Sequence, residues 1–238
     1  MLTVPALVYH KVADIPPGCR FPCNYVRPPQ FAAQLRFLRA AGFESISFGD
    51  YVSYRRGNAR LPRRPVLITF DDGYRTNAQI ATPILRRFGF TATVFLVSNY
   101  IGQTNCWDDG ERQEALLGVD EIRALRKEGI EFQSHTCSHA RLTALAPDEA
   151  FRELRDSRVA LEAIIDAPVS VVAYPWGDCD VAISALAERA GYAAGAIVRR
   201  RTNFDHTPLF ALRRIGINHE TSLGRFAWDL ARLRWRGD

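Results

Sequence analysis

Thr69-Phe70-Asp71-Asp72-Gly73 directly follows Pro65-Val66-Leu67-Ile68, an apolar run typical of a fully buried strand. A strand that ends in two adjacent carboxylates is unusual, because buried charges are costly unless they are paired, hydrogen-bonded or bound to a cation. Neighbouring side chains on an extended chain point to opposite sides, so Asp71 and Asp72 cannot do the same job unless the backbone turns between them. Gly73 allows such a sharp exit. The alternative interpretation is a plain turn, which Asp-Asp-Gly also favours.

On both sides of this stretch, the pattern of apolar residues, glycines and prolines predicts strands that alternate with helices. Besides the strand before Asp71, we expect strands at residues 2–9, 44–48, 91–97, 130–133, 170–174, 192–198 and 210–217. We expect helices at residues 29–42, 49–56, 77–88, 120–128, 147–165 and 181–190, and a last one carrying Phe226, Leu230 and Leu233. Residues 13–30 are rich in proline and glycine and are expected to form a loop. The alternation predicts a single α/β domain over residues 1–238, with a closed or partly closed parallel barrel favoured over an open sheet.

Composition is that of an ordinary soluble protein. The 238 residues are 47% apolar and 24% charged, with a net charge of +5. Lys11 and Lys127 are the only lysines, so 31 − 2 = 29 of the basic residues are arginines. These arginines are spread out and are not interleaved with aromatic residues, so we expect no nucleic-acid partner.

The five cysteines form no Cys-x-x-Cys pair and are expected to be reduced thiols, although Cys19 and Cys23 lie close enough in sequence for a local bridge. No apolar run is long enough for a transmembrane segment. The N-terminal residues lack the pattern of a signal peptide, which predicts a cytoplasmic protein, or a periplasmic or extracellular one if a leader has been removed.

His135 and His139 lie four residues apart, so both rings could face one point on a helical turn. Two neutral imidazoles and one carboxylate make a ligand set for zinc or a similar cation, with positions left open for water and substrate. The alternative interpretation is a pair of loop histidines with no ligand. An Asp-Asp pair at the end of another strand of the same sheet favours the metal site.

Taken together, Thr69-Phe70-Asp71-Asp72-Gly73 and His135-Thr136-Cys137-Ser138-His139 resemble the first two motifs of the polysaccharide deacetylases, the NodB-homology enzymes of carbohydrate esterase family four. The resemblance covers nearly the whole chain. It implies a distorted (β/α) barrel of about seven strands and the metal-dependent removal of N-acetyl groups from amino sugars. It also implies Asp71 as the general base and Asp72, His135 and His139 as the metal ligands, because the base must stand beside the metal to take a proton from its water.

The third motif of the family departs from the pattern here. The family commonly has an arginine that orients the base, but Ala173 stands at that place, and Arg213 or Arg214 are the candidates to replace it. Of the residues that follow, Tyr174, Pro175 and Trp176 are candidate substrate contacts, together with Arg213. The alternative for Tyr174 and Trp176 is plain core packing.

The general acid of the family is a histidine in a late motif, which is not obvious here. His219 follows the last predicted strand, whereas His10 follows the first one in a Tyr9-His10 pair that resembles the exopolysaccharide and poly-N-acetylglucosamine deacetylase branch. We prefer His10, because it is expected at a strand end on the same face as Asp71. For both residues the alternative is a hydrogen-bonded loop histidine.

The leading functional hypothesis is therefore a metal-dependent N-deacetylase of an N-acetylhexosamine-containing glycan, in which a metal-bound water attacks the acetamide carbonyl. Zn²⁺ is the expected ion, and the ligand set would also accept Co²⁺, Ni²⁺ or Fe²⁺. The alternatives are a sugar O-acetyl esterase, an amide hydrolase of small molecules, or a catalytically degenerate glycan-binding module. The sequence does not indicate the glycan's identity, linkage or length, nor the oligomeric state.

Overall fold

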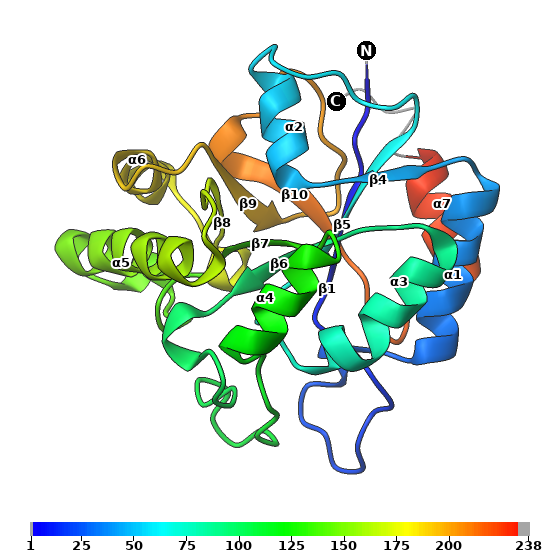
Figure 1. Ribbon diagram of the computed structural model, residues 1–238, viewed down its shortest axis with the longest axis horizontal. Helices are drawn as coiled ribbons and strands as arrows, with labels where there is room; N and C mark the ends of the chain where they lie inside the picture. Colours follow the sequence, from blue (N-terminus) through cyan, green and yellow to red (C-terminus); the bar gives the residue numbers. More distant parts are fainter. Residues whose placement is uncertain (1, 233–238) are drawn as a thin grey trace.

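The computed structural model describes residues 2–232, in which seven parallel strands close into a barrel (Figure 1). The ring closes because the first strand pairs with the last on one side and with β5 on the other. Its strands are β1 (Ala6–Tyr9), β5 (Pro65–Phe70), β6 (Thr93–Leu96), β7 (Glu131–Ser134), β8 (Val171–Ala173), β9 (Ala194–Val198) and β10 (Leu212–Gly216). An eighth strand, β4 (Glu44–Ile46), pairs with the start of β5 outside the ring. The predicted α/β barrel of about seven strands is confirmed.

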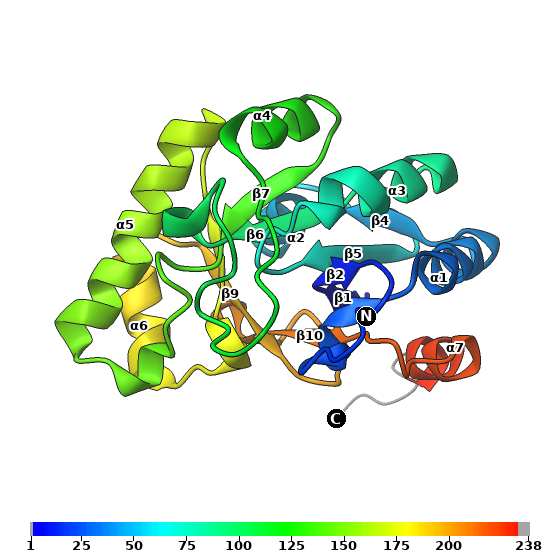
Figure 2. The ribbon, with the colours of Figure 1, turned by 90° about the horizontal axis from the view of Figure 1, so that it is seen from below.

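Helices surround the barrel on its outer side (Figures 1 and 2). They are α1 (Pro28–Ala40), α2 (Phe48–Arg55), α3 (Thr82–Phe88), α4 (Val119–Lys127), α5 (Pro147–Ile165), α6 (Val181–Arg189) and α7 (Leu223–Arg232). Proline in the first turn starts α1, α3 and α5, where its missing N–H costs nothing. The predicted helix at 77–88 begins as a π-helical turn, Asn77–Ala81, before α3. Leu233, expected on the last helix, lies outside the described residues.

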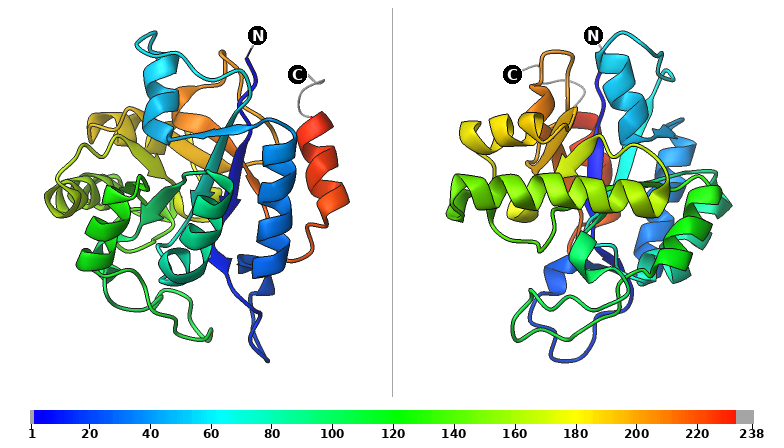
Figure 3. Two further views of the ribbon diagram at one scale, coloured as in Figure 1. Left: turned by 45° about the vertical axis from the view of Figure 1, so that its right-hand side comes forward. Right: turned by 60° about the vertical axis from the view of Figure 1, so that its left-hand side comes forward.

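Two segments project together from the end of the barrel where the strands terminate (Figure 3). One lies between β2 (Lys11–Val12) and β3 (Tyr25–Val26), a short parallel pair that corrects the expectation of an unbroken loop at 13–30. The other is the segment 103–115 between β6 and α4. Arg20 donates to the Asp109 carbonyl and the Phe21 amide donates to Glu111, so the two segments are bonded to each other.

Alternation along the strands divides the apolar side chains into two clusters. Leu7, Ile68 and their neighbours pack between the barrel and the helices, whereas Ala6, Leu67 and Phe95 belong to the other cluster, inside the barrel. Several interior residues are small, namely Ala6, Ala173, Ala194 and Ala196. These alanines leave the barrel interior room for larger side chains, a point that matters for the polar residues described below.

Candidate active site

The candidate residues lie where parallel strands end, which is the face that carries active sites in α/β barrels. Asp71 and Asp72 follow β5, His135 follows β7 and His10 follows β1. Because these strands are neighbours or near neighbours in one closed ring, their ends meet around the barrel mouth.

A sharp backbone turn separates the two aspartates. Asp72 has a φ of 69° and Gly73 a φ of 74°, so the chain leaves the extended conformation directly after Asp71. A Cβ atom at Gly73 would lie 2.6 Å from Leu96 Cδ2, so a larger residue would have to displace the Leu96 side chain as well as adopt a strained positive φ. A positive φ in a non-glycine residue costs about 1–3 kcal/mol and is typical of functional sites. The turn sends Asp71 and Asp72 to different partners.

Asp71 is paired with an arginine inside the barrel. Arg214 Nη2 donates to Asp71 Oδ2 at 2.8 Å, and Nη1 donates to Oδ1 at 2.5 Å, a bidentate arrangement. Arg214 lies on β10, is fully buried, and also donates to Thr69 Oγ1. Its guanidinium lies 5.0 Å from the ring centroid of Phe95. The arginine that is missing at Ala173 on β8 is thus supplied from β10, two strands away.

The Arg214 pairing keeps Asp71 ionised. Burial by itself would raise the pKa of Asp71, but the Arg214 guanidinium, with smaller effects from His135 and His10, more than offsets this and lowers the pKa to about 2. Asp71 is therefore ionised at neutral pH, and its orientation is fixed by Arg214.

Asp72, His135 and His139 form a cluster with metal-ligand chemistry. Their ligand atoms all lie within 4.8 Å of one another. Asp72 Oδ1 is 3.5 Å from His135 Nε2 and 3.4 Å from His139 Nε2. Two imidazole nitrogens and one carboxylate oxygen make a donor set that suits Zn²⁺ and leaves further coordination positions open.

The surroundings of the cluster fit a bound cation. Asp72 Oδ1 is buried and has no hydrogen-bond partner within residues 2–232. Burial, reinforced by Asp71 and Asp108, raises the pKa of Asp72 well above its usual value, so an ionised Asp72 needs a positive partner. His135 Nδ1 is bonded to the Ala173 carbonyl at 2.7 Å, which leaves Nε2 to face the cluster. Burial lowers the pKa of His135 to about 4, so its imidazole is neutral, as a ligand requires.

The loop that carries the two histidines is not helical, in contrast to the helical turn considered from their spacing. Thr136 and His139 both have left-handed φ angles, 69° and 63°. Glu153 on α5 accepts hydrogen bonds from the backbone amides of Cys137 and Ser138, at 3.0 and 2.9 Å. The two rings therefore converge through an irregular loop that α5 holds in place.

The two candidate acids differ in their surroundings. His10 is partly buried, burial lowers its pKa, and its nearest charged groups include Asp71 and Arg214. Among the described residues, His219 has contacts elsewhere: its carbonyl accepts from Gln30, and Nε2 lies 4.0 Å from Glu220. Asp71 and Arg214 are thus among the charged groups that act on His10, whereas the contacts given above for His219 involve its backbone carbonyl and the adjacent Glu220.

The candidate substrate contacts are also divided. Trp176 is 56% exposed, whereas Tyr174 is fully buried and Pro175 is buried beside it. The alternative of core packing therefore holds for Tyr174, since β8 directs its ring into the layer under the helices. Arg213 is partly buried on the opposite side of β10 from Arg214.

Sequence reasoning missed Trp107 and Asp108, which lie in the projecting segment 103–115. The Trp107 ring stacks on the His139 ring, with centroids 4.9 Å apart and planes at 23°. Asp108 is buried and accepts a hydrogen bond from Tyr74, which directly follows Gly73. A tryptophan next to two aspartates in a polar loop is a recognisable signal, but it does not reveal its partners.

Comparison with known proteins identifies the family. The family model for polysaccharide deacetylase matches residues 58–195, more than half of the chain. The chain belongs to the polysaccharide deacetylase family. The putative polysaccharide deacetylase YxkH of Bacillus subtilis is 25% identical over 217 residues, which cover 90% of this chain and 71% of that protein. The fold, the motif resemblance and the family assignment agree.

Further relatives of this polysaccharide deacetylase include a poly-beta-1,6-N-acetyl-D-glucosamine N-deacetylase of Staphylococcus epidermidis. It is 30% identical over 142 residues, which cover 55% of this chain and 47% of that protein. The chain thus matches about half the length of the staphylococcal enzyme. Among solved structures, the Streptococcus pyogenes deacetylase PplD in complex with acetate superposes with a TM-score of 0.83 at 23% identity, covering 96% of this chain and 98% of that one. The putative polysaccharide deacetylase BA0330 of Bacillus anthracis reaches 0.81 at 26% identity, covering 96% and 69%.

Among residues 2–232, every helix is too short or too polar to span a lipid bilayer.

Proposed function

We propose that this polysaccharide deacetylase is a metal-dependent hydrolase that removes N-acetyl groups from N-acetylhexosamine units of a glycan. The observation that carries the proposal is the convergence of Asp72, His135 and His139 directly beside the ionised Asp71–Arg214 pair. We further propose that residues 1–238 act as one catalytic domain.

Asp72, His135 and His139 would hold the cation, with Zn²⁺ as the expected ion and Co²⁺, Ni²⁺ or Fe²⁺ as acceptable substitutes. When bound, such an ion lowers the pKa of a coordinated water and polarises a carbonyl oxygen. The assignment is supported by the lowered pKa values of both histidines, and by Asp72 Oδ1, which has no hydrogen-bond partner among the described residues.

Asp71 is the proposed general base. A water molecule attacks the acetamide carbonyl carbon, and the Asp71 carboxylate accepts the proton that the water loses. Arg214 holds that carboxylate in one orientation through two hydrogen bonds, so the base need not be reorganised during the reaction. Arg214 is thus a positioning residue for the base.

His10 is the proposed general acid. As the carbon–nitrogen bond breaks, the leaving amine takes a proton from the imidazole, and acetate and a free amino sugar result. The position of His10 near Asp71 supports this role. Burial lowers the pKa of His10, which favours the neutral imidazole in the free protein. His10 must therefore be protonated before it can act as the acid.

The proposed substrate is a glycan that carries N-acetyl groups, as in the poly-beta-1,6-N-acetyl-D-glucosamine that names the staphylococcal relative. Exposed Trp176 offers an apolar face on which a sugar ring can stack. The alternatives are a sugar O-acetyl esterase or an amide hydrolase of small molecules, since the same groups would serve either acyl bond. A glycan-binding module is the alternative from another class.

The decisive experiment measures acetate release from defined substrates after removal and return of metal. N-acetylglucosamine oligomers of the β-1,6 and β-1,4 linkages are compared with O-acetylated xylan and with a small acetamide. We expect acetate from the N-acetylglucosamine oligomers, none after chelation, and recovery when Zn²⁺ or Co²⁺ is added.

Asp71→Asn is the matched catalytic variant. It should keep the metal and lose turnover by about 10²–10⁴-fold, the usual contribution of a general base. Release from xylan alone would favour the esterase, release from the small acetamide alone would favour the amide hydrolase, and glycan binding without release of acetate would favour the binding module. A fully active Asp71→Asn variant would remove Asp71 from its role.

A further inference from the structure

The two histidines of the cluster are held in place in different ways. His135 is oriented by the hydrogen bond from its Nδ1 to the Ala173 carbonyl, at 2.7 Å. His139 is also buried, with 9% of its surface exposed, but its Nδ1 has no hydrogen-bond partner among the described residues. Ligand histidines almost always use the second ring nitrogen for such a bond, which fixes the direction of the ring. Something else must therefore orient His139.

Aromatic rings surround His139. Trp107 stacks on it, with centroids 4.9 Å apart and an interplanar angle of 23°. Trp176 packs against it edge-on, at 5.3 Å and 63°. Stacking on the indole of Trp107 restricts the tilt of the imidazole. The edge-on ring of Trp176 restricts its movement parallel to that indole. These contacts restrict the plane and the position of the His139 ring, as the Nδ1 hydrogen bond does for His135.

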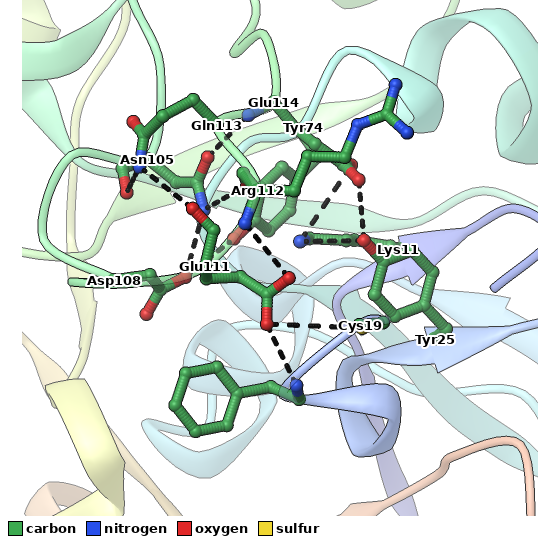
Figure 4. A network of polar contacts seen from close by, with 11 residues as sticks. Lys11, Cys19, Tyr25, Tyr74, Asn105, Asp108, Glu111, Arg112, Gln113 and Glu114 are labelled. Atoms are coloured by element: carbon green, nitrogen blue, oxygen red, sulfur yellow. Dashed lines mark hydrogen bonds and ion pairs between the residues drawn. The ribbon is translucent and has the colours of Figure 1, made fainter. Parts of the chain in front are cut away.

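The position of Trp107 is itself fixed by its neighbours in the chain. Asn105 Nδ2 donates to Asp108 Oδ2 at 3.1 Å, and Asn105 Oδ1 accepts from the Glu114 amide at 2.6 Å. Tyr74 donates to the same oxygen of Asp108. Figure 4 shows the hydrogen bonds of Asn105 and Asp108. These two residues flank Trp107 in the sequence, so their bonds hold the backbone on both sides of it.

A buried lysine anchors this loop to the rest of the barrel mouth. Lys11 is 1% exposed, and its Nζ lies 3.8 Å from Glu114 Oε2. The ammonium also lies over the rings of Tyr25 and Tyr74, 4.6 and 4.3 Å from their centroids. Figure 4 shows Lys11, Tyr25 and Glu114 meeting at one end of the network. These contacts connect the loop to β2, to β3 and to the chain after Gly73. They therefore hold the loop that carries Trp107 in a defined position.

We propose that Trp107 is a positioning residue for the metal ligand His139, acting by ring stacking in place of the missing hydrogen bond. The proposal rests on the metal site of the proposed function. It assigns Trp107 a task in the protein without substrate, namely to direct His139 Nε2 toward the point that Asp72 and His135 also face. A flat aromatic ring at position 107 is the feature that matters, more than the indole itself.

The test measures Co²⁺ binding to the full-length apoprotein, by titration calorimetry and by the visible absorption of the bound ion, with no glycan present. The variants are Trp107→Ala, Trp107→Leu and Trp107→Phe, with Trp228→Ala as a matched control, because Trp228 is 62% exposed on α7. Trp107→Ala should weaken Co²⁺ binding by about 10-fold and alter the spectrum, as expected for a lost outer contact of a ligand. Trp107→Phe should restore both, and Trp228→Ala should behave as the wild type does.

Thermal unfolding of each apoprotein checks the fold, and Trp107→Leu replaces Trp107→Ala in the comparison if the smaller residue unfolds the chain. Wild-type affinity and spectrum in both Trp107→Ala and Trp107→Leu would overturn the proposal, even if these variants lose turnover on glycan, since Trp107 would then act on the sugar. A wild-type protein that binds Co²⁺ no better than Asp72→Ala would instead overturn the metal site itself, and this inference with it.

Discussion

Two carboxylates at opposite ends of the barrel, the partly buried Glu131 and the buried Asp72, have very different surroundings. Glu131 begins β7, and its oxygens accept from the amides of Phe48 and Gly49, both at 2.9 Å, from Thr93 Oγ1 and from Gln133 Nε2. These amides form the first turn of α2, where a negative charge is favourable. Asp72 lies just past the other end of the strands, and its buried Oδ1 has no hydrogen-bond partner in the described part of the chain.

The difference separates a structural carboxylate from a functional one. Glu131 is satisfied by the fold alone, because four donors from three parts of the chain surround it. Asp72 is left unsatisfied by the fold, and its pKa is raised by burial, so its surroundings are complete only with a ligand. Substitutions at the Asp72 end of the barrel should therefore alter metal binding and activity. Substitutions at the Glu131 end should alter stability and leave metal binding and activity unchanged. Four substitutions test this contrast.

Asp72→Ala should have the largest effect. Loss of the carboxylate removes one of three ligands, so bound metal should disappear and turnover should fall by about 10³-fold or more, in line with the several kcal/mol that a metal ion supplies. Metal analysis of the purified variant, beside His135→Ala, measures this. Equal metal content in variant and wild type would contradict the assignment of Asp72 as a ligand.

Arg214→Met should reduce stability as well as activity. It leaves Asp71 as a buried charge without a partner, which costs about 3–5 kcal/mol of unfolding free energy. Urea unfolding measures the loss. The double variant Asp71→Asn/Arg214→Met should recover much of the stability but none of the activity, because no unpaired charge remains. If the double variant is as unstable as Arg214→Met, packing of Arg214 and not charge pairing is responsible.

His10→Ala should lower kcat by about 10²-fold or more, the lower range for a general acid, while His219→Ala leaves it nearly unchanged. The pH dependence of kcat separates the two, because loss of the true acid removes the alkaline limb of the profile. Loss of that limb in His219→Ala alone would assign the acid role to His219 and leave His10 without a role in catalysis.

Glu131→Gln should have the smallest effect on function. Each oxygen of Glu131 accepts from two donors, and the NH2 group of a glutamine accepts from none, so two donor groups are left unpaired at a cost of about 1–3 kcal/mol each. Co²⁺ affinity and kcat should match those of the wild type, since Glu131 lies at the far end of β7 from His135. A selective loss of metal binding without destabilisation would break the contrast between the two ends.

The sequence predicted the architecture well, because strand–helix alternation and glycine or proline boundaries are local signals. It also pointed to Asp71, Asp72, His135 and His139, because two short motifs in the expected order resemble those of a known family. It did not choose between Arg213 and Arg214. That choice depends on which residue of β10 faces inward, and on the small Ala173 and Ala196 that leave space inside the barrel.

Other features of the site depend on long-range contacts that no local pattern encodes. Trp107 stacks on His139 only because Lys11, Tyr25 and Glu114 tie distant segments together. Tyr174 was a candidate for the substrate wall, but the direction of β8 turns it into the core. The left-handed residues Thr136 and His139 replace the helical turn that the histidine spacing allowed, since Glu153 on α5 binds the loop between them.

The Asp71–Arg214 pair also has a consequence for how the chain folds. Its members are 143 positions apart in sequence, and they meet only when β1 has joined β10 to β5 and closed the ring. Contacts of such long sequence separation carry a large loop-closure cost and slow the search for the native state. We therefore expect catalytic activity to return in the last phase of refolding, after helical circular dichroism has recovered, because the base acquires its counterion only in that final closure.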